Sequence, residues 1–468
     1  MTMVLDSARY LNSKSTKQSA MAATALFSVI ACSIVGFYNA ADSAWGLLPI
    51  LIYAVFCIWG LDIVLATALA LLSAFVILQS SPVEVGGFLG AALSNNVTII
   101  GLVSLMGAGL GEVLKNTGVA HNLVSTILNS VGIKSKRTAI VGMMLASMLI
   151  VAMLGTIGGS LAIAAPILIA FATEYKITRR ATAVIFLYGG CAGLALAPFA
   201  GSNIAIMQAA EVSYLQYLTY GAVPLAIMSM IVGIPVICYL QKRAAKVGDY
   251  YPELKAIDSV SDNMHVKRAT KVFIGGLLLT VVYACYTRAG VTLPLLALPV
   301  IALCTAYSAG KSLTEIMQIF YRGAGSIIHL FILFWLLATL FGVVDKMGPF
   351  ENLVAGYRND LIGFSPYGFV LLVALIGLIG IPGASAAVVV LVDQIFGGLA
   401  DQMGISAAAW IIVLIFSSKG DTYGPFPNPN MLTCMGMARY ENLRYVLLSG
   451  WVLLLPCTLM YAILLIFV

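Results

Sequence analysis

Three charged residues lie in or beside strongly apolar stretches of the sequence, where a charge is costly. They are Asp393, Lys419 and Asp421. Ionisable side chains at membrane depth are rare, and they usually belong to ion or substrate pathways. Asp421 could bind a coupling cation or carry a proton, and Lys419 could pair with it or attract an anion. We therefore predict ion coupling at these three positions, with an interfacial salt bridge between Lys419 and Asp421 as the alternative.

Small polar residues gather where glycine and proline interrupt four of these stretches. Both residue types disfavour a continuous helix, so we expect breaks that begin near Gly155, Pro198, Gly380 and Lys419. Carbonyl groups freed at such depth must be satisfied by neighbours, water or a ligand, and half-helix ends suit carboxylates and Na⁺. For a single glycine, close helix packing or a kink is the alternative. The predicted substrate-binding residues are Gly159, Ser160, Ser202, Asn203, Gly383, Ser385, Thr422, Asn428 and Asn430.

Other chemistry finds little support in the sequence. It contains no GxxxxGK[ST] phosphate loop, so we do not expect this chain to use ATP. No GxSxG, HExxH or CxxC motif occurs, and three scattered histidines do not make a metal site. We predict no enzyme activity, no cofactor and no metal, apart from Na⁺ as a coupling ion at the helix breaks.

The composition defines the elements that must position these residues. Charged residues make up 9% of the 468 and hydrophobic residues 61%, whereas an ordinary soluble domain is about 25% charged. The apolar runs are continuous, which excludes a β-barrel, and the net charge of +6 is spread over short loops, which argues against nucleic-acid binding. The predicted fold class is therefore an all-α polytopic membrane protein.

The distribution of lysine and arginine predicts the orientation. With the N-terminus in the cytoplasm and each apolar run crossing once, only Arg288, Lys346 and Arg358 of the 25 basic residues lie outside. Runs such as 139–155 and 157–173 could be two spans or one re-entrant hairpin, and both options preserve this orientation. The predicted parts, in the inner (cytoplasmic) membrane, are a cytoplasmic N-terminal segment (1–20), a first transmembrane half (21–240), a cytoplasmic basic linker (241–269) and a second transmembrane half (270–468).

The two halves share sequence patterns in the same order. Residues 111–124 (GEVLKNTGVAHNLV) match 342–354 (GVVDKMGPFENLV) with one gap. Further along the chain, two more pairs of segments correspond, namely 157–166 with 381–390 and 198–203 with 425–430. An odd number of predicted crossings separates corresponding elements, so we predict two inverted structural repeats, a recurrent plan in secondary transporters.

These motifs resemble the ion transporter superfamily, which includes NhaC-type sodium/proton antiporters and gluconate permease-like transporters. The likeness covers most of the chain from about residue 45, and the C-terminal GDTYGPFPNPN segment is part of it. It implies a secondary transporter, a homodimer, elevator-like movement, and repeats that each contribute a re-entrant hairpin and an unwound helix. It also implies that serine, threonine and asparagine at the breaks bind substrate and Na⁺. The chain lacks the paired Ser-Asn-Thr tips of dicarboxylate carriers, so the substrate does not carry over.

Three functions follow from the sequence. The first is a secondary active transporter of a small organic anion, with a carboxylate as the expected class, coupled to Na⁺ or H⁺. The second is a Na⁺/H⁺ antiporter in which Asp421 or Asp393 exchanges the two cations. The third is a passive channel. In all three cases the expected partners are a small solute or ion, the lipid bilayer and a second copy of the chain, with no nucleic acid.

Overall fold

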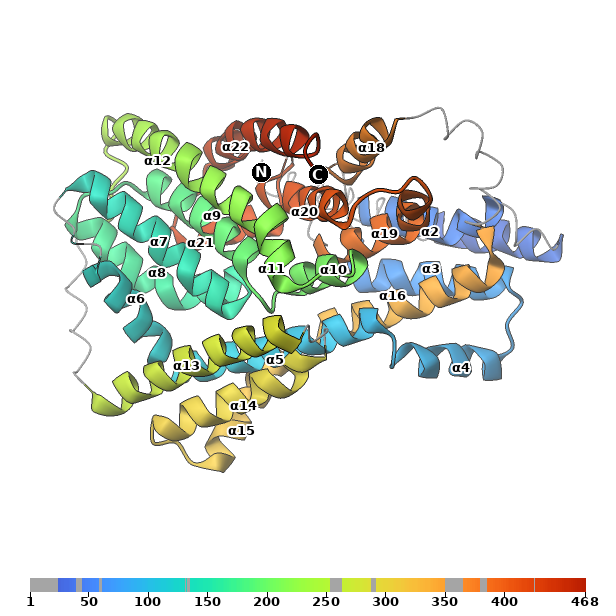
Figure 1. Cartoon of the computed structure of the whole chain (residues 1–468), viewed down its shortest axis with the longest axis horizontal. Coiled ribbons are helices and arrows are strands. Elements are labelled where there is room, and N and C mark those ends of the chain that lie inside the picture. Colours follow the sequence, from blue (N-terminus) through green and yellow to red (C-terminus); the bar gives the residue numbers. More distant parts are fainter. Residues whose placement is uncertain are drawn as a thin grey trace, which may run out of the picture. The chain divides into compact units, whose positions relative to one another are not determined.

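The chain is helical throughout the part that the structure describes. The computed structural model covers residues 24–38, 44–58, 61–130, 132, 135–252, 263–287, 292–349, 365–378, 385–424 and 426–468, and every regular element in these ranges is a helix (Figure 1). Six of these helices are long and apolar enough to cross a membrane, or seven if one bent pair is counted as a single span. The chain divides into two compact units, and the described residues of the predicted site all belong to the second.

The first unit comprises residues 1–98 and 332–363. Its helices are Thr24–Phe37, η1 (Ala44–Leu47), α2 (Leu48–Ile58), α3 (Ile63–Ile77), α4 (Pro82–Ala92) and most of α16 (Ile328–Met347). Asp62 caps α3, and Ser81 and Glu84 form a capping box at the start of α4. The indole nitrogen of Trp335 donates to the carbonyl of Leu89 at 2.8 Å, so α16 is tied to α4.

The second unit comprises residues 99–331 and 364–468. Its elements up to the hydrophilic linker are α5 (Asn96–Asn116), α6 (Val119–Ser130), α7 (Lys136–Leu154), α8 (Ile157–Glu174), α9 (Arg179–Leu196), α10 (Gly201–Ala209), α11 (Tyr214–Tyr217), the π-helical turn η2 (Leu218–Ala222) and α12 (Val223–Ala245). Those after it are α13 (Met264–Thr287), α14 (Leu293–Ser308), α15 (Leu313–Gly325), α18 (Pro366–Leu378), α19 (Ser385–Gln402), α20 (Ala407–Tyr423), α21 (Pro429–Met437) and α22 (Leu443–Leu464).

Helix α9 is packed deeply within this unit. It is buried without interruption from Ala181 to Gly193, because its sequence is apolar or small on every side. A Cβ atom on Gly193 would lie 2.2 Å from the carbonyl oxygen of Met148, and one on Gly189 would lie 2.6 Å from that of Met144. Helices α7 and α9 therefore pack backbone against backbone, so these two glycines serve close packing and not a helix break.

Candidate functional site

The first helix break lies between α9 and α10, which meet at an angle of 43°. The chain is non-helical from Ala197 to Ala200, and α10 begins at Gly201. The side-chain amide of Asn203 donates to the freed carbonyls of Leu194, Ala195 and Ala197 at 2.7, 3.0 and 2.7 Å. One asparagine thus closes most of the break.

Two tyrosines complete the closure of this first break. The hydroxyl of Tyr214 donates to the carbonyl of Leu196 at 2.6 Å, and that of Tyr217 donates to the carbonyl of Ala195 at 2.7 Å. These carbonyls are therefore satisfied by neighbouring side chains, the first of the three options that the sequence left open. Neither tyrosine was predicted from the sequence, although a Tyr-x-x-Tyr pair that follows a predicted break was a usable signal.

The second helix break lies between α20 and α21, and it is closed in a similar way. Asn428 caps α21 by accepting from the amide of Met431 at 2.9 Å, while its own amide donates to the carbonyl of Thr422 at 3.1 Å. The prediction that this break begins at Lys419 was wrong, because α20 continues as a helix to Tyr423. The polar residues of its last turn are therefore held on a rigid helix.

Lys419 connects the two breaks. Its ammonium group donates to the hydroxyl of Ser202 at 3.1 Å and to the side-chain oxygen of Asn203 at 3.0 Å, and only 2% of the lysine is exposed. We call Ser202, Asn203 and Lys419 the Lys419 cluster. The structure thus brings together three residues that the sequence predicted as site residues, although more than 200 positions separate Ser202 from Lys419.

Two further polar residues lie on α20 next to the Lys419 cluster. Thr422 is fully buried, and its carbonyl is 4.0 Å from the sulfur of Cys191. Ser418 is also fully buried, and its hydroxyl has no hydrogen-bond partner among the described residues. Ser418 is thus a buried polar group that the described residues leave without a hydrogen-bond partner.

Asp393 occupies a separate place in the unit. Its carboxylate accepts a hydrogen bond from the indole of Trp410 at 2.8 Å. Trp410 precedes Lys419 by nine positions on the same helix, a rise of about 14 Å at 1.5 Å per residue. Asp393 is therefore not part of the Lys419 cluster, and its partner Trp410 was not predicted from the sequence.

The predicted site residues Gly159 and Ser160 follow the turn between α7 and α8. Gly159 and Ser160 lie in the first turn of α8, and the serine hydroxyl bonds to the carbonyl of Thr156. A Cβ atom on Gly155 would lie 3.5 Å from the amide nitrogen of Ala200, so the α7–α8 turn touches the first break.

The remaining predicted residues fall into three groups. Ser385 begins α19, which packs on α10. Asn430 is partly exposed in the first turn of α21. Gly383 and the side chain of Asp421 lie outside the described residues.

Comparison with known proteins gives one family and a shared fold. The model of the Na⁺/H⁺ antiporter family matches residues 3–240, just over half of the 468-residue chain. The YdaH transporter of Alcanivorax borkumensis has a similar structure, with a TM-score of 0.60, 13% identity and coverage of 82% of this chain and 87% of that one. MtrF of Neisseria gonorrhoeae is similar with a TM-score of 0.51, 14% identity and coverage of 81% and 83%. A search of curated proteins finds no match.

Proposed function

The chain belongs to the Na⁺/H⁺ antiporter family, and from this premise we propose that it exchanges Na⁺ for protons at the Lys419 cluster. The chain is a multi-pass membrane protein and a secondary transporter, not an enzyme. The resemblance to the ion transporter superfamily that the sequence predicted is confirmed, as is the all-helical polytopic fold. The ions, the site and the direction of exchange belong to the proposal.

One observation carries this proposal, namely that the hydroxyl of Ser202 and the amide oxygen of Asn203 accept hydrogen bonds from the ammonium group of Lys419. A hydroxyl and an amide oxygen at 3.1 and 3.0 Å are ligands of the type that hard cations prefer. Two positive charges a few ångströms apart repel strongly where water is excluded. Na⁺ and a protonated Lys419 therefore compete for Ser202 and Asn203, and binding of one favours release of the other.

The arrangement of helices around the cluster supports a symmetric transport unit. Helix α8, which follows the first hairpin turn, packs on α21, and α19 packs on α10. Each of these helices thus contacts the short helix that follows the break in the other half of the chain. Two inverted repeats would produce this exchange of contacts. The proposal therefore includes inverted repeats, an elevator-like movement, a homodimer, and an inner-membrane location with the N-terminus in the cytoplasm.

A small organic anion is the second candidate substrate, and a specific observation favours it. The ammonium group of Lys419 contacts the first turn of α10, where the helix end carries a partial positive charge that attracts anions. MtrF, which shares the fold, is described as belonging to a class of antimetabolite efflux pumps. In this version Lys419 binds the anion, and Asp393 or Asp421 carries the coupling ion.

Exchange in proteoliposomes distinguishes these functions. Na⁺/H⁺ antiport predicts that an outward Na⁺ gradient acidifies the lumen without any organic solute. An anion carrier predicts no such proton movement until a carboxylate is added. Passive uptake that ignores both Na⁺ and pH gradients would support the channel and contradict both transporter versions. Lys419→Gln should abolish the exchange. Lys311→Gln is its matched control, because Lys311 forms its ion pair with Glu315 on a partly exposed surface.

A further inference from the structure

Two turns at one end of the second unit hold strained residues. Lys176 follows α8 and Arg439 follows α21, and both have left-handed backbones with φ values of 52° and 51°. Neither residue is glycine, so each conformation costs energy and persists only where surrounding contacts enforce it. The two helices that end in these turns pack against each other. We call the two segments the α8–α9 turn and the α21–α22 turn.

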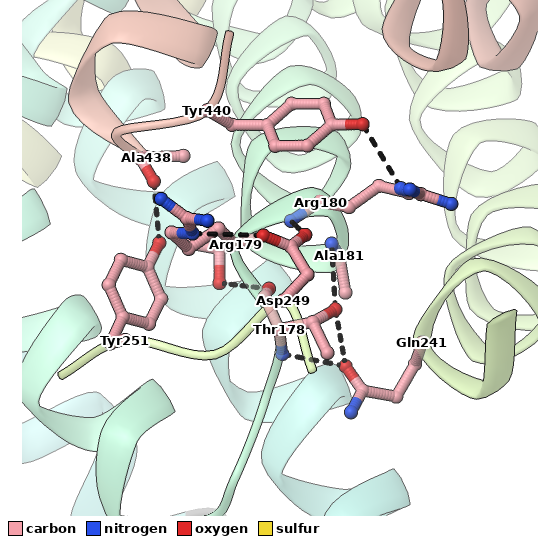
Figure 2. A network of polar contacts seen from close by, with 10 residues as sticks. Thr178, Arg179, Arg180, Ala181, Gln241, Asp249, Tyr251, Ala438 and Tyr440 are labelled. Carbon is pink, nitrogen blue, oxygen red and sulfur yellow. Dashed lines mark hydrogen bonds and ion pairs between the residues drawn. The ribbon is translucent and has the colours of Figure 1, made fainter. Parts of the chain in front are cut away.

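Residues from the end of α12 and the segment after it hold the α8–α9 turn. The side-chain oxygen of Gln241 accepts from the amide and the hydroxyl of Thr178 at 2.8 and 3.0 Å, and its nitrogen donates to the carbonyl of Lys176. The carboxylate of Asp249 accepts from the guanidinium of Arg179 at 2.9 Å and from the amide of Arg180 at 3.0 Å (Figure 2). Asp249 therefore supplies the negative charge that a helix N-terminus favours.

The same segment also reaches the α21–α22 turn. The hydroxyl of Tyr251 donates to the carbonyl of Ala438 at 2.8 Å, directly before the strained Arg439 (Figure 2). Directly after it, the hydroxyl of Tyr440 accepts from the guanidinium of Arg180 at 3.0 Å. Burial raises the pKa of the Tyr251 phenol, which therefore stays a hydrogen-bond donor throughout the physiological range.

Arg180 joins the two turns most directly. Besides its bond to Tyr440, its guanidinium lies 3.8 Å from the ring centroid of Tyr445, a cation–π distance. Arg180 lies in the first turn of α9, which runs buried to the first break. Ala438 follows α21, which begins at the second break. A contact between these helix ends therefore affects the distance between the two breaks, and with it the distance from Lys419 to Ser202 and Asn203.

We propose that residues 241–251 are a strap that holds the α8–α9 and α21–α22 turns together, and that Arg180 is the positioning residue through which it fixes the Lys419 cluster. The effect on transport rests on the function proposed above, whereas the mechanical connection does not. The strap makes the two break-bearing arms move as one body. Its loss loosens both turns and misplaces Ser202 and Asn203 relative to Lys419.

Hydrogen exchange of the purified full chain tests the mechanical connection without any assumption about substrate. Tyr251→Phe removes one hydrogen bond to Ala438, worth a factor of roughly five in local opening. The strap predicts faster exchange in the α21–α22 turn and also at the amides of Thr178 and Arg179, which donate to Gln241 and Asp249 and not to Tyr251. Tyr250→Phe, one residue away, is the matched control and should change neither turn. Faster exchange confined to residues 438–440 would overturn the proposal.

Transport kinetics test the positioning role of Arg180. Arg180→Lys keeps the charge but loses the planar fork, and Tyr440→Phe removes its acceptor. Each change should raise the half-saturating Na⁺ concentration by roughly five-fold, with the maximal rate changed by less than two-fold. The double variant should match Arg180→Lys, because Tyr440→Phe then has no further bond to Arg180 to remove. Unchanged half-saturation, or fully additive effects, would overturn the proposal. If wild-type transport ignores Na⁺, the function has failed while the exchange result still decides the strap.

Discussion

At the scale of single residues, Asn203 has two separate tasks. Its side-chain nitrogen closes the first break by donating to three carbonyls, and its oxygen accepts from Lys419. Ser202 beside it has only the second kind of task, because its hydroxyl contacts Lys419 and Asn203. The two neighbours therefore separate structural from functional effects, although the sequence predicted them as equivalent site residues.

Replacement by alanine should distinguish these two residues. Asn203→Ala takes the donor from the carbonyl of Ala197 and one of two donors from those of Leu194 and Ala195, so we expect a loss of about 2 kcal/mol or more in the free energy of unfolding. Ser202→Ala should cost about 1 kcal/mol or less but weaken Na⁺ binding several-fold, since one oxygen ligand is gone. Thermal denaturation in detergent, with and without NaCl, measures both effects. Equal destabilisation by the two variants would contradict the division of tasks.

At the scale of elements, both breaks are sealed by helices packed against them. Tyr214 and Tyr217 of α11 cover the first break. Helix α22 covers the second break at Gly450, where a Cβ atom would lie 2.2 Å from the carbonyl oxygen of Tyr423. Only glycine permits this approach, so the position of α22 depends on that residue.

A pair of glycine substitutions tests this packing. Gly450→Ala should lower the free energy of unfolding by about 1–3 kcal/mol, because α22 must move away from the second break. Gly436→Ala on α21 is the control, since a Cβ atom there meets nothing within 4 Å and alanine favours a helix. Melting temperatures of the two variants in the same detergent give the comparison. A Gly450→Ala protein as stable as the control would refute the close contact.

At the scale of the whole molecule, the charge distribution predicts which loops face the same side. Lys346 is predicted to lie outside, whereas Lys311 and Arg439 are predicted to lie in the cytoplasm. Single cysteines at these three positions, in a background without native cysteines, test this with a membrane-impermeant maleimide added to intact cells. Only the Lys346→Cys protein should react. Labelling of Arg439→Cys from outside would reverse the orientation of the second half.

The sequence predicted much of the fold because apolar length and glycine or proline breaks are local signals. The runs 139–155 and 157–173 correspond to α7 and α8 within a few residues. Ser202, Asn203 and Lys419 were also predicted, since polar groups at membrane depth are conspicuous in a chain with so few charges. The partners of the freed carbonyls were not predictable, because Tyr214 and Tyr217 act through tertiary contacts. For the same reason the sequence did not show that Asp393 and Lys419 lie apart. Their separation follows from the path of α20, on which Trp410, the partner of Asp393, lies nine positions before Lys419.

Proton release on Na⁺ binding is the most direct test of the proposed exchange. Purified protein in weakly buffered detergent solution at pH 7–8 is mixed with NaCl, and the change in pH is recorded with choline chloride as the control salt. Exchange at the Lys419 cluster predicts proton release that saturates at about one proton per chain. This release should be lost in Lys419→Gln, where no ammonium group competes with Na⁺. No release from the wild type, or equal release from Lys419→Gln, would contradict exchange at the Lys419 cluster.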